Sequence, residues 1–524
     1  MVKRIRRKRR KARNQNIEHD NIHTGSYDVI PDTVDAVETR LSEIFSDCND
    51  FMHRKISCSG KSQTKILVAY INGFVDKRLL NQDVIHPILE FLSNTEMCEA
   101  HIYEMLKECI VINNDIKEIN NMQQAIDGII SGEALLFLDG ENKALMIGVK
   151  EPKGRQVDEP VTETSIRGSR EGFVENLNTN IALIRKMIKN PNLKLEKVQL
   201  GKQTKTDICI CYIKGIANEN IVREVRERLK KIKTDAILDT GIIEQYISDS
   251  RLSVFPTVGN TERSDKLAGK LLEGRVGILC DGTPYVLTIP YLFIESIQNT
   301  DDYYDHAYFA SFMRLLRLLA LLVSNLLPGI YVALVGFHHT LIPFKLMIKL
   351  AASRQGIPFS PFTEAVLMIV AFEFLREAGV RMPRPIGEAL SIVGAIVLGE
   401  ASVSAGIASN LMVIIIALTA ICSFVVPPLI RATMLLRFVF LAAANFLGFL
   451  GISFVGVAVI IHLCQLRSFG VPYMAPFSPL TANDLKDSIV VVPIWAMVTR
   501  PKILRQEYSR SKKGTKRQEV KKPQ

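Results

Sequence analysis

The sequence predicts a tandem α/β repeat in a soluble front half, followed by an all-α membrane domain that crosses the bilayer several times. First, 48% of the 524 residues are hydrophobic and the mean hydropathy is positive, which is high for a soluble protein. Second, the chain is polar to about Asp305, overwhelmingly apolar from Arg314 to Cys464, and polar again beyond. Third, the front half contains two similar blocks at one constant spacing.

The spacing of these blocks is 142 residues. KILVAYINGFVDKRLL, from Lys65, resembles DICICYIKGIANENIV, from Asp207, and GEALLFLDGENKALMI, from Gly132, resembles GRVGILCDGTPYVLTI, from Gly274. Two motifs in one register favour two copies of one unit. Each copy is expected to contain a helix, a buried strand that leads through a Gly turn into an amphipathic helix, and a hairpin with a type I′ Asp-Gly turn. The expected ranges are 34–150 and 174–305 for the units, 33–48 and 174–189 for the helices, and 66–71 and 208–213 for the strands.

Both ends of the chain are strongly basic. Nine of the first thirteen residues are Lys or Arg, and 500–524 contains ten more against two Glu. Such runs are typical either of nucleic-acid-binding arms or of segments that lie on anionic lipid and mark a cytoplasmic side. Because membrane segments lie between them, we expect anionic lipid and no nucleic acid. We assign 1–33 to a disordered tail and 467–524 to a cytoplasmic C-terminal tail. No secretory signal follows the basic start, so the front half is expected in the cytosol.

Catalytic motifs are not found in the front half. It has no phosphate-cradling Gly loop, Ser elbow or His pair at ligand spacing, and the nine cysteines lack metal-ligand spacing. Asp139 and Asp281 stand where turn chemistry already favours Asp. We therefore expect a binding or assembly protein with no catalytic residue, cofactor or metal.

The segment 151–173 between the copies is expected to be a linker. Arg167, Arg170 and Glu171 lead into a helix that carries Arg185. These four residues belong either to a solvated linker with a helix start or to a strip that binds a partner.

Five apolar stretches are candidate membrane segments within 306–466. They are about 318–337, 361–380, 386–408, 411–430 and 438–464. In the first, Pro328 frees the carbonyl one turn earlier, and a neighbour or water must satisfy it. The last is long enough for a strongly tilted helix or for a hairpin broken around Gly448 to Gly456. Basic ends on one side favour an even number of crossings, four or six.

Two carboxylates lie inside the second stretch. Glu364 and Glu373 are nine residues apart and so face opposite sides of a helix, which excludes an acid/base pair within it. Glu364 suits the first helical turn, and Glu373 can meet Arg376. They are either satisfied locally in this way or line a polar, water-filled interior.

The stretch 386–408 carries two stripes at helical spacing. Small residues form one stripe, which would let helices pack closely: Ala395, Gly399, Ser402 and Gly406. The neighbouring stripe is Val393, Val397, Glu400 and Ser404. In a ring of identical subunits this second stripe would line a cation pathway. Alternatively, the segment is a short helix near the membrane interface with Glu400 in water.

Several blocks together carry a resemblance to a known family. EPVTETSIRGSREGFVENLNTNIALIR, RVGILCDGTPYVLTIP, DDYYDHAYFASFMRLLR, LIPFKLMIKLAASRQGIPFSPFTEAVLMIVAFEFLREAGVRMPR with the stretch that follows it, and SFGVPYMAPFSPL occur in this order. Over roughly 34–500 the chain resembles the A subunit of GerA-type spore germinant receptors. The long basic start is not part of the family pattern, and Glu400 stands where the family often has an uncharged residue.

The resemblance implies a multi-pass protein of the inner spore membrane with its soluble half facing the spore core. It implies a transporter-like B subunit and a lipoprotein C subunit as partners, and nutrient-triggered germination through a gated, homo-oligomeric ion channel. A non-conducting membrane scaffold that assembles the receptor is the alternative. A solute transporter is disfavoured, because the apolar segments show no inverted repeat.

Overall fold

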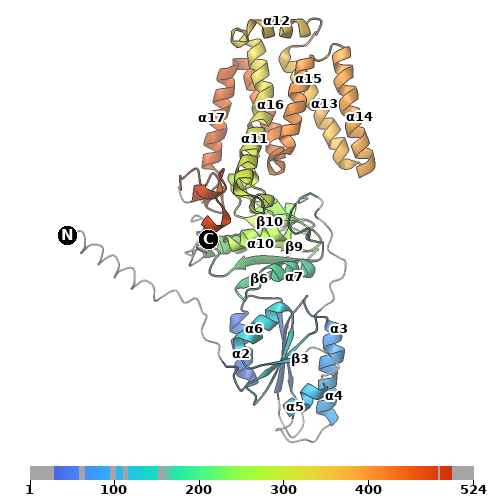
Figure 1. Ribbon diagram of the computed structural model, residues 1–524, viewed down its shortest axis with the longest axis vertical. Coiled ribbons are helices and arrows are strands. Elements are labelled where there is room, and N and C mark those ends of the chain that lie inside the picture. The colour runs from blue at the N-terminus through green and yellow to red at the C-terminus, as the bar shows by residue number, and fades with distance from the viewer. Residues whose placement is uncertain are drawn as a thin grey trace, which may run out of the picture.

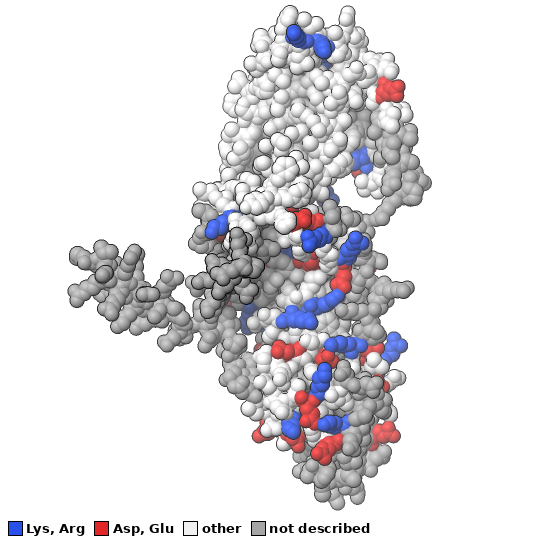
Figure 2. Space-filling model, viewed as in Figure 1, with Lys and Arg blue, Asp and Glu red and all other residues white. Residues whose placement is uncertain are grey.

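The computed structural model describes residues 29–57, 65–94, 102–109, 116–150, 160, 162–163, 167–481 and 484–497. Figure 1 shows an elongated molecule with two α/β units at one end and a bundle of helices at the other. In Figure 2, charged side chains crowd the visible face of the α/β units, whereas that of the bundle is almost uncharged except near its far end. The polar and apolar halves of the sequence are therefore spatially separate.

The first α/β unit is a five-stranded antiparallel sheet in the order β1-β2-β4-β5-β3. Its elements are α2 (Val34–Ile44), β1 (Phe51–Ser57), β2 (Lys65–Ile71), α3 (Lys77–Leu79), η1 (Leu80–Ile85), α4 (His86–Asn94), α5 (Ile102–Cys109), β3 (Ile116–Ile119), α6 (Met122–Ser131), β4 (Ala134–Leu138) and β5 (Ala144–Ile147). Alternate residues of β2 enter cores on opposite faces: Leu67 and Ala69 on one, Ile66 and Val68 on the other. Helices cover both faces, which explains why the strand is continuously apolar.

The second unit repeats this arrangement with the order β6-β7-β9-β10-β8. Its elements are α7 (Leu177–Met187), β6 (Leu193–Leu200), β7 (Thr206–Ile213), α8 (Glu219–Lys231), α9 (Thr240–Ile247), β8 (Gly259–Thr261), α10 (Ser264–Leu272), β9 (Val276–Cys280) and β10 (Val286–Ile289). The strand order is the same after renumbering, so the repeat predicted from the 142-residue offset is confirmed in the fold. Cys209 and Cys211 on β7 are buried free thiols, and burial raises the pKa of Cys211 to about 12.

The Asp-Gly hairpins are confirmed, but the predicted type I′ turn is wrong. Each loop spans more than two residues, and Asp139 and Asp281 are not among the residues with positive φ, whereas Gly140 and Gly282 are. The aspartates instead cap the first helix of their own unit. Asp139 accepts a hydrogen bond from Val34 N at 2.9 Å, and Asp281 accepts one from Leu177 N at 3.0 Å. The sequence predicted a structural role in the turn for both aspartates. In the structure, their carboxylates cap the first helix of each unit.

Replacing Asp139 with Ala is expected to destabilise the start of α2 by about 1 kcal/mol, because the N-cap residue Thr33 makes no side-chain capping bond of its own. Amide hydrogen exchange at Val34 and Val37 should then be about fivefold faster. Asp127→Ala on the exposed side of α6 is the control, since its carboxylate only accepts a bond from Gln123 within the same helix. Unchanged exchange in the Asp139 variant would contradict the capping role.

A buried ion pair joins the two units. Arg185 on α7 is fully buried and donates two hydrogen bonds to Asp50, from Nε at 2.9 Å and Nη2 at 2.8 Å. Beside it, Cys48 forms a parallel bridge with Leu195 of β6. Arg185 therefore does not belong to a partner-binding strip, and that part of the hypothesis is wrong. It lies on the face of α7 that is turned toward the first unit.

The rest of the predicted strip packs partly against the second unit. The Glu171 carboxylate accepts hydrogen bonds from Lys186 Nζ at 2.5 and 2.8 Å, and its carbonyl accepts one from Ser264 Oγ. Arg167 and Arg170 are exposed. Most of 151–166 lies outside the described residues.

The bundle contains seven helices of the described chain. They are α11 (Ala307–Gly336), α12 (Phe344–Ser353), α13 (Pro361–Arg381), α14 (Arg384–Ser404), α15 (Asn410–Phe424), α16 (Ile430–Leu447) and α17 (Phe449–Gln465). All but α12 run along the bundle, and α12 lies across the end that is remote from the α/β units (Figure 1). Two helices, Ala307–Gly336 and Pro427–Leu447, are long and apolar enough to cross a bilayer, whereas α15 and α17 are apolar but shorter.

Two of the expected segments end differently in the structure. The stretch 411–430 is not one helix, because α15 ends at Phe424 and the Pro427–Leu429 turn leads into α16. The stretch 438–464 is broken at Gly448, whose φ of 60° and ψ of −136° separate α16 from α17. Of the two interpretations left open for that stretch, the hairpin is the one found.

The segment after α17 is not the free tail that the sequence suggested. Strands β11 (Arg467–Ser468) and β12 (Val471–Pro472) pair with each other, and Phe293 N donates to Tyr473 O at 3.0 Å. Tyr473 and Ala475 are fully buried. Residues 467–497 therefore pack onto the second unit in their described part, and the basic ends 1–28 and 498–524 lie outside the described residues.

Candidate functional site

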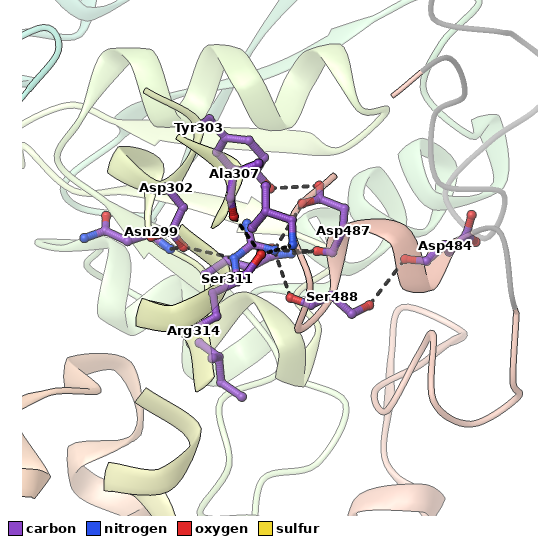
Figure 3. A network of polar contacts seen from close by, with 12 residues as sticks. Asn299, Asp302, Tyr303, Ala307, Ser311, Arg314, Asp484, Asp487 and Ser488 are labelled. Carbon is purple, nitrogen blue, oxygen red and sulfur yellow. Dashed lines mark hydrogen bonds and ion pairs between the residues drawn. The ribbon is translucent and has the colours of Figure 1, made fainter. Parts of the chain in front are cut away.

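The junction between the second unit and the bundle is organised around Arg314 (Figure 3). Arg314, in the early turns of α11, is fully buried, and its Nε donates to Asp302 Oδ2 at 3.0 Å. Its Nη1 donates to Asp487 O at 2.7 Å, to Asp487 Oδ1 at 3.1 Å and to Ser488 O at 2.8 Å. One guanidinium thus joins the helix, the segment that follows β10, and the C-terminal segment.

Further contacts complete this junction network. Arg317 donates to the same Asp302 oxygen at 2.7 Å and to Ile297 O at 3.1 Å. Tyr303 OH donates to Asp487 Oδ2 at 2.9 Å, and burial raises the pKa of this hydroxyl. Val491 N donates to Ser311 Oγ at 2.9 Å. Two arginines face two aspartates, so the charges of this buried network balance.

A second buried cluster of charged residues lies in the second α/β unit, close in sequence to the junction. Glu295 accepts Leu292 N through Oε1 at 2.7 Å, and its Oε2 lies 3.0 Å from Lys270 Nζ and also pairs with Arg275. Burial lowers the pKa of Lys270 to about 8, against the opposing effect of Glu295. The short helix that holds Glu295 leads directly to Asp302 and α11. The polar contacts of Glu295 and those of Asp302 thus lie within one short stretch of chain that connects the second sheet to α11.

Inside the bundle, Glu373 belongs to a buried charged group. Its carboxylate lies 2.6 Å from Arg376 on α13 and 3.6 Å from Arg437 on α16. Arg437 Nε also donates to Ser324 O at 3.0 Å. Ser324 lies four residues before Pro328, so this is the carbonyl that the proline leaves free. The prediction that a neighbour must satisfy this carbonyl is confirmed, and the neighbour is Arg437.

At the remote end of the bundle, Glu364 is fully buried. It accepts Arg354 Nη1 at 2.7 Å, and Ser409 N and Ser409 Oγ at 2.6 Å each. Ser409 is the N-cap residue of α15, so the carboxylate also lies near the positive end of that helix dipole. Glu364 and Glu373 are thus each paired with an arginine of the same chain, and Glu373 meets Arg376 as one of the two interpretations expected.

Helix α14 packs on α13 through glycines other than those predicted. A Cβ at Gly387 would lie 2.8 Å from Gly379 O, and one at Gly394 would lie 2.5 Å from Leu375 Cδ2. At Gly399 the nearest atom is Val413 Cγ1, at an ordinary 3.7 Å. Gly406 is not on the helix at all: it follows the end of α14 with φ of 65°, where Gly commonly terminates a helix, so its place on a packing stripe is corrected.

The other predicted residues of α14 are partly uncovered in the single chain. Val397 is 55% exposed, Glu400 and Ser404 are exposed, and Ser402 is half-buried. The Val393 and Ala395 side chains lie outside the described residues. The structure contains one copy of the chain and shows no contact between copies. The pore-lining and packing roles of these α14 residues therefore stay predictions.

Sequence reasoning missed Arg314, Asp302, Asp487 and Arg437 as site residues. In the sequence, Arg314 marks only the start of the apolar part of the chain. For Arg437 a signal existed, since it is a cation in the middle of the apolar helix α16 and such a charge must find a partner. Nothing in the sequence indicated that Asp487 returns to α11 from a distance of more than 170 residues.

Comparison with known proteins gives a consistent result. The family described as Bacillus/Clostridium GerA spore germination protein matches residues 39–503. Spore germination protein KA of Bacillus subtilis (strain 168) is 43% identical over 463 residues, which are 88% of this chain and 84% of that protein. Spore germination protein GerLA of Bacillus cereus is 36% identical over 459 residues, 87% of this chain and 92% of that protein.

One solved structure is also similar. The N-terminal domain of the A subunit of the Bacillus megaterium spore germinant receptor GerK3 aligns with 51% of this chain and 97% of that chain, at 33% identity and a TM-score of 0.41.

Proposed function

Because this chain belongs to the Bacillus/Clostridium GerA spore germination protein family, we propose that it is the A subunit of a nutrient germinant receptor and forms a gated, oligomeric ion channel in the inner spore membrane. The curated relatives support the A-subunit role. The channel is our extension. The observation that carries it is the uncovered face of α14, where Val397, Glu400 and Ser404 find no cover in their own chain although the helix is apolar. Neighbouring copies would cover this face and enclose a passage.

The carboxylates of α13 and α14 are consistent with a passage lined by α14. Glu364 and Glu373 are paired with arginines of their own subunit, whereas the Glu400 carboxylate on α14 is exposed and available to a shared passage. A ring of such carboxylates favours cations.

We propose six crossings with the α/β units and the C-terminal segment on one side. The six helices that run along the bundle alternate in direction (Figure 1), and the segment after α17 returns to α11 at the Arg314 junction. The soluble half then faces the spore core. The protein acts without catalysis or a cofactor, alongside a transporter-like B subunit and a lipoprotein C subunit. Its basic ends lie on anionic lipid.

Conductance of the purified protein in liposomes tests the channel. Wild-type protein should pass monovalent cations, and Val397→Ala should raise the leak severalfold because it widens an apolar constriction. Ile421→Ala on α15, which is 65% exposed, is the matched control and should leave the leak unchanged. Equal conductance in all three proteins and in empty liposomes would leave the scaffold as the better function.

A further inference from the structure

Leu252 is unusually exposed for a large apolar side chain. It is 98% exposed, more than any other large hydrophobic residue of the described chain. It lies in the loop between α9 and β8, where Arg251 is also exposed and Val254 is 37% exposed. This loop of the α/β unit therefore presents an apolar tip beside a cation.

The loop is held against the base of the bundle. Ser253 Oγ lies 3.0 Å from His462 Nε2 in the last turn of α17. Phe255, two residues further, is buried in a cluster with Leu429, Leu463 and Leu466, at the near ends of α16 and α17. Leu252 thus projects from an anchored position at the level where the apolar helices end.

Positive charge and exposed aromatic residues gather at the same end of the bundle. Arg431, in the first turn of α16, and Arg467, directly after α17, are both exposed. The neighbouring acidic residue Asp249 is occupied by Arg228, at 2.6 Å, and by Phe469 N. Tyr308, in the first turn of α11, is 91% exposed. Aromatic side chains favour the membrane–water boundary, and basic rims with apolar tips favour anionic lipid.

We propose that the loop from Arg251 to Val254 inserts into the headgroup layer of the leaflet beside α17 and anchors the second α/β unit to anionic lipid. The proposal rests on the placement of the bundle in the membrane given above. It adds a lipid contact that fixes the distance between the second sheet and the bilayer. A displacement of that sheet would then be taken up by the Arg314 junction rather than by tilting of the whole unit.

The chain has one tryptophan, Trp495, so a Trp495→Phe background permits single-tryptophan probes. Three probes are Leu252→Trp, Phe454→Trp on the 68% exposed site of α17, and Leu89→Trp on α4, at the end of the molecule remote from the bundle. Each full-length protein is reconstituted into vesicles of phosphatidylcholine and phosphatidylglycerol with brominated acyl chains. Bromine quenches tryptophan only within a short distance.

Emission of the Leu252→Trp probe should be blue-shifted and quenched severalfold more than that of Leu89→Trp, most strongly by bromine near the headgroup. The quenching should weaken when phosphatidylglycerol is omitted or when Arg251→Gln is added. Water-like emission with quenching equal to Leu89→Trp overturns the anchor, and so does blue-shifted emission without quenching, which would mean that protein covers the loop. If Phe454→Trp is quenched and Leu252→Trp is not, the anchor alone fails. If Phe454→Trp is not quenched, the bundle is outside the bilayer and both proposals fail.

Discussion

Replacing Arg314 with Met is expected to release the C-terminal segment 484–497 from the base of α11. The substitution keeps much of the side-chain volume but leaves Asp302 and Asp487 facing each other without this guanidinium. Breaking one partner of a buried ion pair costs about 3 to 5 kcal/mol, because the remaining charge stays buried. The main-chain carbonyls of Asp487 and Ser488 lose their shared donor as well. Limited proteolysis of the detergent-solubilised protein should therefore cut within 484–497 far faster than in wild type.

The matched control is Arg381→Met on α13. Arg381 also pairs with a carboxylate, Glu377 at 2.6 Å, but its side chain is 77% exposed. Exposed pairs contribute little, so we expect a change of less than about 1 kcal/mol and no new cleavage. Arg314→Lys should fall between the two, because an ammonium keeps the charge but loses the fork that reaches both aspartates. If Arg314→Met and Arg381→Met behave alike, the junction does not depend on this residue.

The same variant has a functional consequence under the proposed function. Spores that carry Arg314→Met, at wild-type protein level, should germinate poorly with their nutrient, because the second sheet would no longer be coupled to α11. Normal germination together with normal proteolytic protection would mean that the junction stays intact without Arg314. Normal germination with a cleaved segment would mean that Arg314 holds the segment in place but does not couple the second sheet to α11.

Much of the fold was predictable because it depends on local patterns. The continuous apolar strands, the Asp-Gly hairpins and the constant offset indicated two copies of one unit, and the sheets share one strand order. The helix ends were less accessible. A stretch such as 411–430 is apolar throughout, and only the Pro427-Pro428 pair indicates that one helix ends and another begins there. The turn type was missed because the Asp side chains are used for helix capping, which depends on a contact between residues more than 100 positions apart.

The candidate site was less predictable for the same reason. A single charged residue shows its partner only in three dimensions: one of the two interpretations placed Arg185 on a partner-binding strip, yet it is buried against Asp50. The small-residue stripe of α14 was real as a pattern. Within one chain, however, the closest approaches are at Gly387 and Gly394, where α13 supplies a glycine and a leucine. The sequence pattern indicates which residues permit close packing, but it does not say which partner helix uses them.

Arg437→Met is expected to destabilise the bundle by about 3 to 5 kcal/mol. Arg437 is 2% exposed, and its loss leaves Glu373 with Arg376 alone and leaves Ser324 O without a donor. Thermal unfolding of the detergent-solubilised protein should show a clearly lower midpoint. Adding Glu373→Gln should recover part of the loss, because it removes the charge that Arg437 partly neutralises, and a double-mutant cycle measures this coupling.

The proline offers a sharper test of the same residue. Pro328→Ala restores an N–H that can donate to Ser324 O within α11, so this carbonyl no longer depends on Arg437. In that background Arg437→Met should cost less by about 1 to 3 kcal/mol, the penalty of one unsatisfied buried group. Leu441→Ala, a buried apolar change on the same helix, should cost the same in both backgrounds. If Arg437→Met costs the same with Pro328 as with Ala at this position, the guanidinium does not satisfy the carbonyl freed by the proline, and its burial must be explained by Glu373 alone.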